Sequence, residues 1–416
     1  MAVILLTFLG TGRYEPCRYS FATAAEPSDE VIYYSAALAG HLKPDRVVSL
    51  ETKDAALKHG EALARAFRAL GCEHEAVRIP GGASETELWE IFGALTRHVP
   101  EGCTLHLDIT HGFRSLPVLG FIALSYLRVT RKVTIGGIYY GAWEARDGAT
   151  MVVPTFQLAP FLTLLDWTAA ADQFFSSGSA VRLGELLGQA QQTLWRDPGD
   201  LARTELPKKL KTLGKSIRQS SMNLLLLRTG SLRGSGENLA KRIEEAKAEA
   251  SVFARPFVEL LEPVRDQLSR FSGIDLETLR DLVGWLAERG QTAASLTLAS
   301  EWLTSYVMVV CGETGHHAGY QVRKPYSLAV AVLENPEMEV KRDATGVKAE
   351  AIVAMVRSRL KEDQIERLRS AAGVIRSARN DLNHAGFNEG PKDAEGLAER
   401  AVSVAEEIRK KGWVGA

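Results

Sequence analysis

The sequence predicts two parts of different architecture: an α/β domain with a parallel, doubly wound sheet over residues 1–155, and an all-α region over residues 156–416. Short apolar runs alternate with helical patterns in the first part, and alternating β and α elements predict a parallel sheet. The pattern in the second part is helical almost to its end. With 45% hydrophobic and 24% charged residues, the 416-residue chain has the composition of a globular protein with two or three cores.

The strands and helices of the first part follow one another regularly. Strands are predicted near residues 3–9, 46–50 and 74–79, up to Asp108, and over 132–140; helices are predicted near 54–70, near 84–98 and after Gly112. The carboxyl ends of parallel strands share one edge of a sheet, where ligands bind in such folds. We therefore expect three loops to meet there, with Tyr140-Gly141 as a further wall: Gly10-Thr11-Gly12-Arg13, Leu50-Glu51-Thr52 and the loop that begins at Asp108.

The loop Asp108-Ile109-Thr110-His111-Gly112-Phe113-Arg114 joins an apolar strand to a helix. Backbone N–H groups and the helix dipole favour anions at such a junction. Thr110, His111 and Arg114 are therefore candidates for contact with an anionic ligand. We interpret Asp108 as an organiser of the loop, because a carboxylate repels phosphates.

Several classes of protein are disfavoured by the sequence. The apolar run over residues 3–9 has no basic region before it and ends in Gly10-Thr11-Gly12, so it resembles a buried strand more than a signal peptide. No stretch reaches the ~18 apolar residues of a membrane span, and we expect a cytoplasmic protein without membrane contact. The four cysteines lack paired spacing, which argues against a disulfide framework or a zinc site. Gly10-Thr11-Gly12 also lacks the third glycine of a dinucleotide fingerprint, where Glu15 stands.

A formal net charge of −1 gives the whole molecule no basic footprint for duplex nucleic acid. One segment is nevertheless locally basic and opposed only by Glu205. It is either a solvated helix face and loop or a surface for RNA backbone or ligand phosphate. Its cations are Arg203, Lys208, Lys209, Lys211, Lys215, Arg218, Arg228 and Arg233.

In the helical part, we expect long segments near 160–195, 237–270, 275–310, 348–385 and 393–411, with breaks at Gly230–Gly236, Gly312–Gly319 and Asn335–Gly346. One predicted helix has an unusual polar face. Ala371, Ile375, Ala378, Leu382 and Ala385 form its core stripe at ~100° per residue, while Arg379, Asn380, Asn383 and His384 share an adjacent arc. Histidine exchanges protons near neutral pH and arginine stabilises a developing phosphorane, as metal-independent RNA cleavage requires. The spacing alone also suits an exposed face or a dimer contact.

Two of these motifs together resemble a known family. Asp108-Ile109-Thr110-His111-Gly112 resembles the Asp-x-Thr-His-Gly signature of CRISPR-associated proteins whose N-terminal, Rossmann-like CARF domain binds cyclic oligoadenylate. Arg379-Asn380-Asp381-Leu382-Asn383-His384 resembles the Arg-x4-His motif of HEPN ribonucleases. The motifs occur in the family's order and in the settings it predicts, a βα junction and a helix near the end of an all-α region.

The resemblance implies a single-stranded RNA endoribonuclease of type III CRISPR antiviral defence, activated by cyclic oligoadenylate. Two subunits, or an oligomer of such dimers, would pair their CARF domains around the ring and their HEPN domains around one RNase site. Arg379 and His384 would be catalytic with Asn380 as a polar helper, no metal or other cofactor would be required, and cyclic tetra-adenylate is the expected activator. The products would carry a 2′,3′-cyclic phosphate and a 5′-OH. Residues expected to bind the ring are Gly10, Thr11, Gly12, Arg13, Thr52, Thr110, His111, Gly112 and Arg114.

Some roles stay open at this point. His111 would contact a phosphate or an adenine, hold the loop through Asp108, or help to cleave the ring. Two alternatives to the RNA endoribonuclease remain. One is a ring nuclease that degrades cyclic oligoadenylate, and the other is a sensor without enzymatic activity that recruits a partner. His316-His317 is expected in a loop or dimer contact, and Glu301-Trp302 in the core with a polar anchor, or with Glu301 beneath Arg379 as its buried partner.

Overall fold

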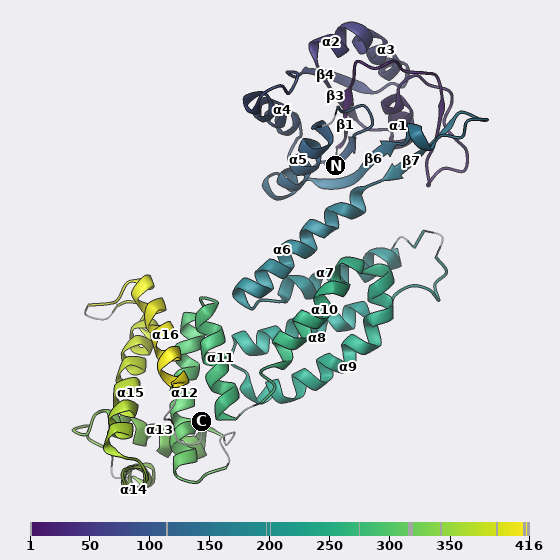
Figure 1. Cartoon of the computed structure of the whole chain (residues 1–416). Coiled ribbons are helices and arrows are strands. Elements are labelled where there is room, and N and C mark those ends of the chain that lie inside the picture. Colours follow the sequence, from purple (N-terminus) through teal and green to yellow (C-terminus); the bar gives the residue numbers. More distant parts are fainter. Residues whose placement is uncertain are drawn as a thin grey trace. The chain divides into compact units, whose positions relative to one another are not determined.

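The computed structural model describes the whole chain apart from Met1, Arg114, Asp197, Asp200, Ile274, 315–318, Arg342, 388–389, 411–412, 414–416 and the side chain of Arg233. The chain forms two compact units, Met1–Leu165 and Asp166–Ala416 (Figure 1). The first has a mostly parallel sheet with helices and the second is largely helical, which confirms the predicted order of an α/β part and a helical part.

The described sheet has the strand order β2-β7-β6-β5-β1-β3-β4. All neighbouring strands pair in parallel except β6 and β7, which are antiparallel. The five predicted strands are confirmed, and β2 and β7 were not predicted. β2 is too short to show alternation, and Pro154 inside β7 argues against a strand in the sequence. The strands are β1 (Val3–Leu9), β2 (Arg18–Ser20), β3 (Arg46–Glu51), β4 (Glu73–Arg78), β5 (Thr104–Asp108), β6 (Thr134–Gly141) and β7 (Val152–Gln157).

Both faces of this sheet are buried. Along β1, Ile4, Leu6 and Phe8 belong to one apolar cluster, and Leu5 and Leu9 belong to another. Successive side chains of a strand point to opposite faces, so the sheet is covered on both sides. The first cluster includes residues of α4 (Glu85–Arg97) and α5 (Leu116–Thr130), and the second includes residues of α1 (Tyr34–Leu42) and α3 (Glu61–Ala69).

Two details of these helices differ from expectation. α1 was not predicted, because Tyr34 to Ala39 are all buried and the segment therefore lacks a polar face. The helix expected near 54–70 is divided into α2 (Lys53–Ala55), a π-helical turn η1 (Ala56–Gly60) and α3. Two short 3₁₀ turns, η2 (Trp143–Ala145) and η3 (Ala159–Phe161), flank β7.

The helical part surrounds one large apolar core. α8 and α13 were not predicted, and the predicted break at Gly230–Gly236 is wrong because α9 runs through it. A Cβ on Gly236 would lie 2.0 Å from Ser272 Oγ, so this glycine permits close packing. The helices are α6 (Leu162–Ser177), α7 (Val181–Arg196), α8 (Leu210–Leu225), α9 (Thr229–Phe253), α10 (Arg255–Ser269), α11 (Leu276–Glu288), α12 (Thr292–Val310), α13 (Tyr320–Glu334), α14 (Ala344–Arg359), α15 (Glu362–Asn383) and α16 (Ala394–Arg409).

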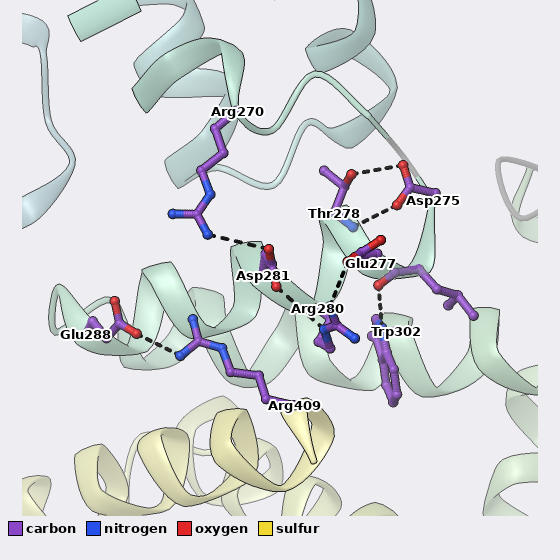
Figure 2. A network of polar contacts seen from close by, with 10 residues as sticks. Arg270, Asp275, Glu277, Thr278, Arg280, Asp281, Glu288, Trp302 and Arg409 are labelled. Atoms are coloured by element: carbon purple, nitrogen blue, oxygen red, sulfur yellow. Dashed lines mark hydrogen bonds and ion pairs between the residues drawn. The ribbon is translucent and has the colours of Figure 1, made fainter. Parts of the chain in front are cut away.

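α11 joins two groups of helices through polar contacts at its surface (Figure 2). Asp281 on α11 accepts a hydrogen bond from Arg270, which follows α10, at 3.4 Å. Glu288 at the C-terminal end of α11 pairs with Arg409 of α16 at 2.8 Å. These pairs are partly exposed and contribute little energy individually.

Among the described helices, α12 is long and apolar enough by composition to cross a membrane. In the structure, 67% of its apolar window is buried within the protein. Trp302 and Tyr306 of this helix are completely buried in the core. Packing inside the helical unit therefore accounts for its apolar character.

α7 and α8 approach each other through two glycines, which yields a test of the fold. A Cβ on Gly184 would lie 2.4 Å from the carbonyl oxygen of Gly214. Gly184→Ala should therefore lower the free energy of unfolding by about 1–3 kcal/mol through overpacking. Gly188→Ala on the same helix has nothing within 4 Å of the added methyl group and should stabilise the protein by up to ~1 kcal/mol. Thermal unfolding of both variants measures this, and equal midpoints would contradict the close approach.

Candidate functional site

A buried carboxylate organises the carboxyl end of β5. Asp108 is fully buried and accepts hydrogen bonds from Thr7 Oγ1 of β1 at 2.7 Å and from Thr110 N at 2.8 Å. Thr110 Oγ1 in turn accepts a hydrogen bond from Gly141 N at the end of β6, at 2.9 Å. Burial raises the pKa of Asp108 to about 6, although its hydrogen bonds oppose the shift. The geometry agrees with the loop-organising interpretation of Asp108.

His111 packs in an aromatic cluster beside this loop. The ring of Tyr14 lies edge-on to the rings of His111 and His59, with centroid distances of 4.5 and 4.7 Å. Burial, with a smaller effect of His59, lowers the pKa of His111 to about 4, so the imidazole is neutral at pH 7. Its Nε2 is buried without a hydrogen-bond partner among the described residues. A neutral imidazole can exchange one hydrogen bond with a ligand but cannot attract phosphate as a cation.

The loop after β1 meets the loop after β5 directly. A Cβ on Gly10 would lie 3.0 Å from the carbonyl oxygen of His111, so glycine permits this approach. Two carbonyl groups of the loop are held by side chains from η1: Lys58 Nζ donates to Thr11 O at 3.2 Å, and His59 Nε2 bonds Gly12 O at 2.9 Å.

A pocket of about 390 Å³ opens between these loops. Of the residues predicted to bind a ligand, four line it: Gly12, Arg13, Thr110 and His111. Tyr140 and Gly141 also line it, at the position expected for a further wall.

The other predicted ligand residues have different positions. Gly10 and Thr11 lie in the loop but do not line the pocket, and Gly112 packs against Phe8 and Pro117, each 3.2 Å from an added Cβ. Thr52 accepts a hydrogen bond from Ala55 N and caps α2, so the second of the three expected loops does not line the pocket. Arg114 lies outside the described residues.

Six further pocket residues escaped the sequence analysis: Tyr14, Glu15, Tyr19, Ile32, Trp143 and Glu144. Tyr14 and Glu15 directly follow the predicted Gly10–Arg13 loop, and extending that loop by one turn would have found them. Arg146 lies 4.4 Å over the ring of Trp143, and Tyr140 donates a hydrogen bond to Glu144. The pocket thus combines aromatic faces and carboxylates, which suit a base, with the Arg13 guanidinium, which suits a phosphate.

The second group of predicted residues lies at the end of α15. Arg379 is partly buried, and its Nη1 donates to Ser300 Oγ of α12 at 2.7 Å. Its Nε is buried and has no partner among the described residues. His384 is the exposed C-cap of the helix, with its N–H bonded to Asn380 O at 3.1 Å, and Asn380 and Asn383 are exposed.

The predicted core stripe of this helix is confirmed in part. Ala371, Ile375 and Ala378 are buried and Leu382 is partly buried. Ala385 was placed wrongly, because α15 ends at Asn383 and Ala385 is exposed with a φ of 51°. The chain leaves the helical path at this point, so the stripe stops one turn earlier.

Asp381, inside the motif, has a structural role that the sequence analysis missed. It is buried, and its Oδ2 accepts a hydrogen bond from Lys392 N at 2.8 Å, immediately before α16. A carboxylate in the last turn of a helix is disfavoured by the helix dipole. Its presence there could have indicated such an anchor for the loop that follows His384.

Two lesser expectations have different outcomes. Trp302 lies in the core and donates from Nε1 to Leu276 O at 2.8 Å (Figure 2), as expected. The alternative that placed Glu301 beneath Arg379 is wrong, because Glu301 pairs with Arg323 at 2.8 Å. His316-His317 lies outside the described residues.

Part of this chain is similar in sequence to a known CRISPR-associated protein. Residues 163–275 match the family model for the second domain of CRISPR-associated protein MJ1674. CRISPR-associated protein MJ1674 of Methanocaldococcus jannaschii is 24% identical to the chain over 207 residues, which are 49% of this chain and 29% of that protein. The aligned part therefore spans less than a third of the relative. Both matches show that part of this chain is similar to CRISPR-associated protein MJ1674.

The buried carboxylate predicts a specific dependence of stability on pH. The folded-state pKa of Asp108 is about 6 against an ordinary 3.8, so ionisation opposes folding. The cost grows as pH rises from about 4 to about 6 and reaches the order of 3 kcal/mol above that. In Asp108→Asn, the amide can accept from Thr110 N and donate to Thr7 without this cost.

The stability of Asp108→Asn relative to the native protein should therefore rise between pH 4 and pH 7. Thermal unfolding over this range measures the difference. A difference that does not change with pH would contradict the raised pKa.

Proposed function

We propose that the protein is a metal-independent endoribonuclease of CRISPR defence that cleaves single-stranded RNA when cyclic oligoadenylate binds its α/β unit. The observation that carries this proposal is the state of Arg379. Its guanidinium is partly buried, has a hydroxyl group as hydrogen-bond partner, and pairs with no carboxylate in the described part of the chain. A buried charge without a counter-charge is unfavourable, so this group is suited to bind a phosphate. The similarity to CRISPR-associated protein MJ1674 supports the role in defence.

The two side chains have distinct roles in the proposed reaction. Attack of a ribose 2′-OH on the adjacent phosphorus requires proton transfer from that hydroxyl and to the leaving 5′-oxygen. His384, exposed at the helix end, moves these protons. Arg379, fixed by Ser300, holds the scissile phosphate and stabilises the charge of the transition state. Two subunits across a two-fold axis would bring two copies of this helix end to one site.

The pocket of the α/β unit is the proposed ring site. A volume of about 390 Å³ is at the lower end of the ~300–1,000 Å³ typical of small-molecule sites, so one pocket holds part of a ring. A second subunit would supply the rest. Arg13 would bind a phosphate, neutral His111 would use its free Nε2 for one hydrogen bond, and the aromatic rings would contact adenine.

Substitution at the end of α15 tests the catalytic assignment. Arg379→Ala and His384→Ala should each lower the rate of ring-stimulated RNA cleavage by at least ~100-fold, since each removes a transition-state interaction. Both should bind labelled cyclic tetra-adenylate like the native protein. Cleavage should persist in EDTA and leave 2′,3′-cyclic phosphate ends.

Arg376→Ala is the matched control, because Arg376 lies on the same helix but pairs with Glu334 at 2.7 Å. It should retain cleavage. Substantial cleavage by both Arg379→Ala and His384→Ala would refute the assignment. Loss of labelled ring without RNA cleavage would instead support a ring nuclease, and ring binding without either reaction would support a non-enzymatic sensor.

A further inference from the structure

The helical unit carries a strip of cations that the proposed nuclease site does not use. Residues 206–236 contain Lys208, Lys209, Lys211, Lys215, Arg218, Arg228 and Arg233 and no Asp or Glu. This segment forms α8 and the start of α9, and it lies within the part of the chain that matches the second domain of MJ1674.

Three of these cations lie on one face of α8, and a fourth closely precedes the helix. Lys211, Lys215 and Arg218 follow one another at intervals of three or four residues, which places them on one side of α8, and Lys208 lies two residues before the helix begins. All four are exposed, and none forms a salt bridge within the described structure. Arg376 on α15, by contrast, has a carboxylate partner. The α8 strip therefore presents uncompensated positive charge to solvent.

A polar groove of about 300 Å³ runs beside this strip, between α8 and α9. Most of its lining residues carry hydroxyl or amide groups, which commonly contact the phosphates and sugars of nucleic acids. Two cations also line the groove, Lys215 of α8 and Arg242 of α9. Its lining residues are Thr212, Lys215, Ser216, Gln219, Ser220, Ser235, Asn238 and Arg242.

Two carboxylates of α9 have other partners. Glu249 Oε2 accepts hydrogen bonds from Lys208 N at 2.9 Å and from Lys209 N at 2.7 Å. Glu245 pairs with Arg242 at 2.8 Å. In the described structure, neither carboxylate forms an ion pair with a lysine side chain of the strip.

An exposed aromatic ring lies at the beginning of the strip. Trp195 at the end of α7 is 46% exposed, and its Nε1 donates to Pro207 O at 2.7 Å, next to Lys208. The hydrogen bond fixes the indole beside the first cations. Exposed aromatic faces next to a positive groove are typical of single-strand binding, because unpaired bases stack on them.

We propose that Trp195, Lys208, the three cations on one face of α8 and the α8–α9 groove bind the sugar-phosphate backbone of single-stranded RNA. Binding is independent of sequence, since charge and stacking do not read base edges. The surface holds the strand outside the Arg379 and His384 site. The choice of RNA over another polyanion rests on the proposed function.

A binding measurement with uncleavable RNA tests this inference. A fluorescein-labelled 2′-O-methyl RNA lacks the attacking 2′-OH, so its anisotropy reports binding whether or not Arg379 and His384 catalyse cleavage. For single strands, log K falls with log salt by ~0.7 per neutralised phosphate, so four cations give a slope of roughly −3. Lys211→Ala/Lys215→Ala should reduce the slope to roughly −1.5 and weaken binding at low salt.

The control variant Lys241→Ala/Lys247→Ala removes the same charge from α9 and should bind like the native protein. Trp195→Ala should bind roughly tenfold more weakly, and Trp195→Phe should retain most of the affinity. Equal losses in the two lysine pairs would show attraction by net charge only and would overturn the proposal. Unchanged binding by Lys211→Ala/Lys215→Ala, or equal affinity for duplex RNA, would also overturn it.

Discussion

The candidate ligand site of the α/β unit depends on one buried carboxylate. Asp108 ends β5, accepts a hydrogen bond from Thr7 of β1, and holds Thr110, whose hydroxyl reaches Gly141 of β6. The loops that line the pocket are thereby tied to neighbouring strands of the sheet. Burial makes the ionised carboxyl group unfavourable and raises its pKa. The protein thus gives up some stability for a fixed geometry at the edge where ligands bind in such sheets.

The sequence predicted what depends on local periodicity and missed what depends on packing. Apolar runs such as Val3–Leu9 identify strands buried on both faces, whereas α1 has no polar face and gave no helical signal. The break expected at Gly230–Gly236 was wrong because Gly236 serves contact with Ser272 instead of ending a helix. At the pocket, strand ends located His111, but Tyr19 arrives through the pairing of β2 with β7, for which the sequence carried no signal.

The two candidate sites share a physical feature. His111 in the pocket and Arg379 on α15 each have a buried nitrogen without a partner among the described residues. Six other buried polar atoms of the described residues share this feature, so it supports the two sites only together with the pocket around His111 and the motif at the end of α15. In the proposed function, the first meets the cyclic activator and the second meets the scissile phosphate. The two candidate sites lie in different compact units of the chain, so the proposed function would assign regulation to one unit and catalysis to the other.

The central claim is that binding in the first unit controls RNA cleavage in the second. The most direct measurement is the rate of cleavage of labelled single-stranded RNA by the native protein as cyclic tetra-adenylate is titrated, with ring binding measured in parallel. The account predicts background cleavage without the ring and a saturable rise whose midpoint follows ring occupancy. Cleavage at the same rate without the ring would contradict the account. Binding of rings of every size tested to saturation, with no change in the rate of cleavage, would also contradict it.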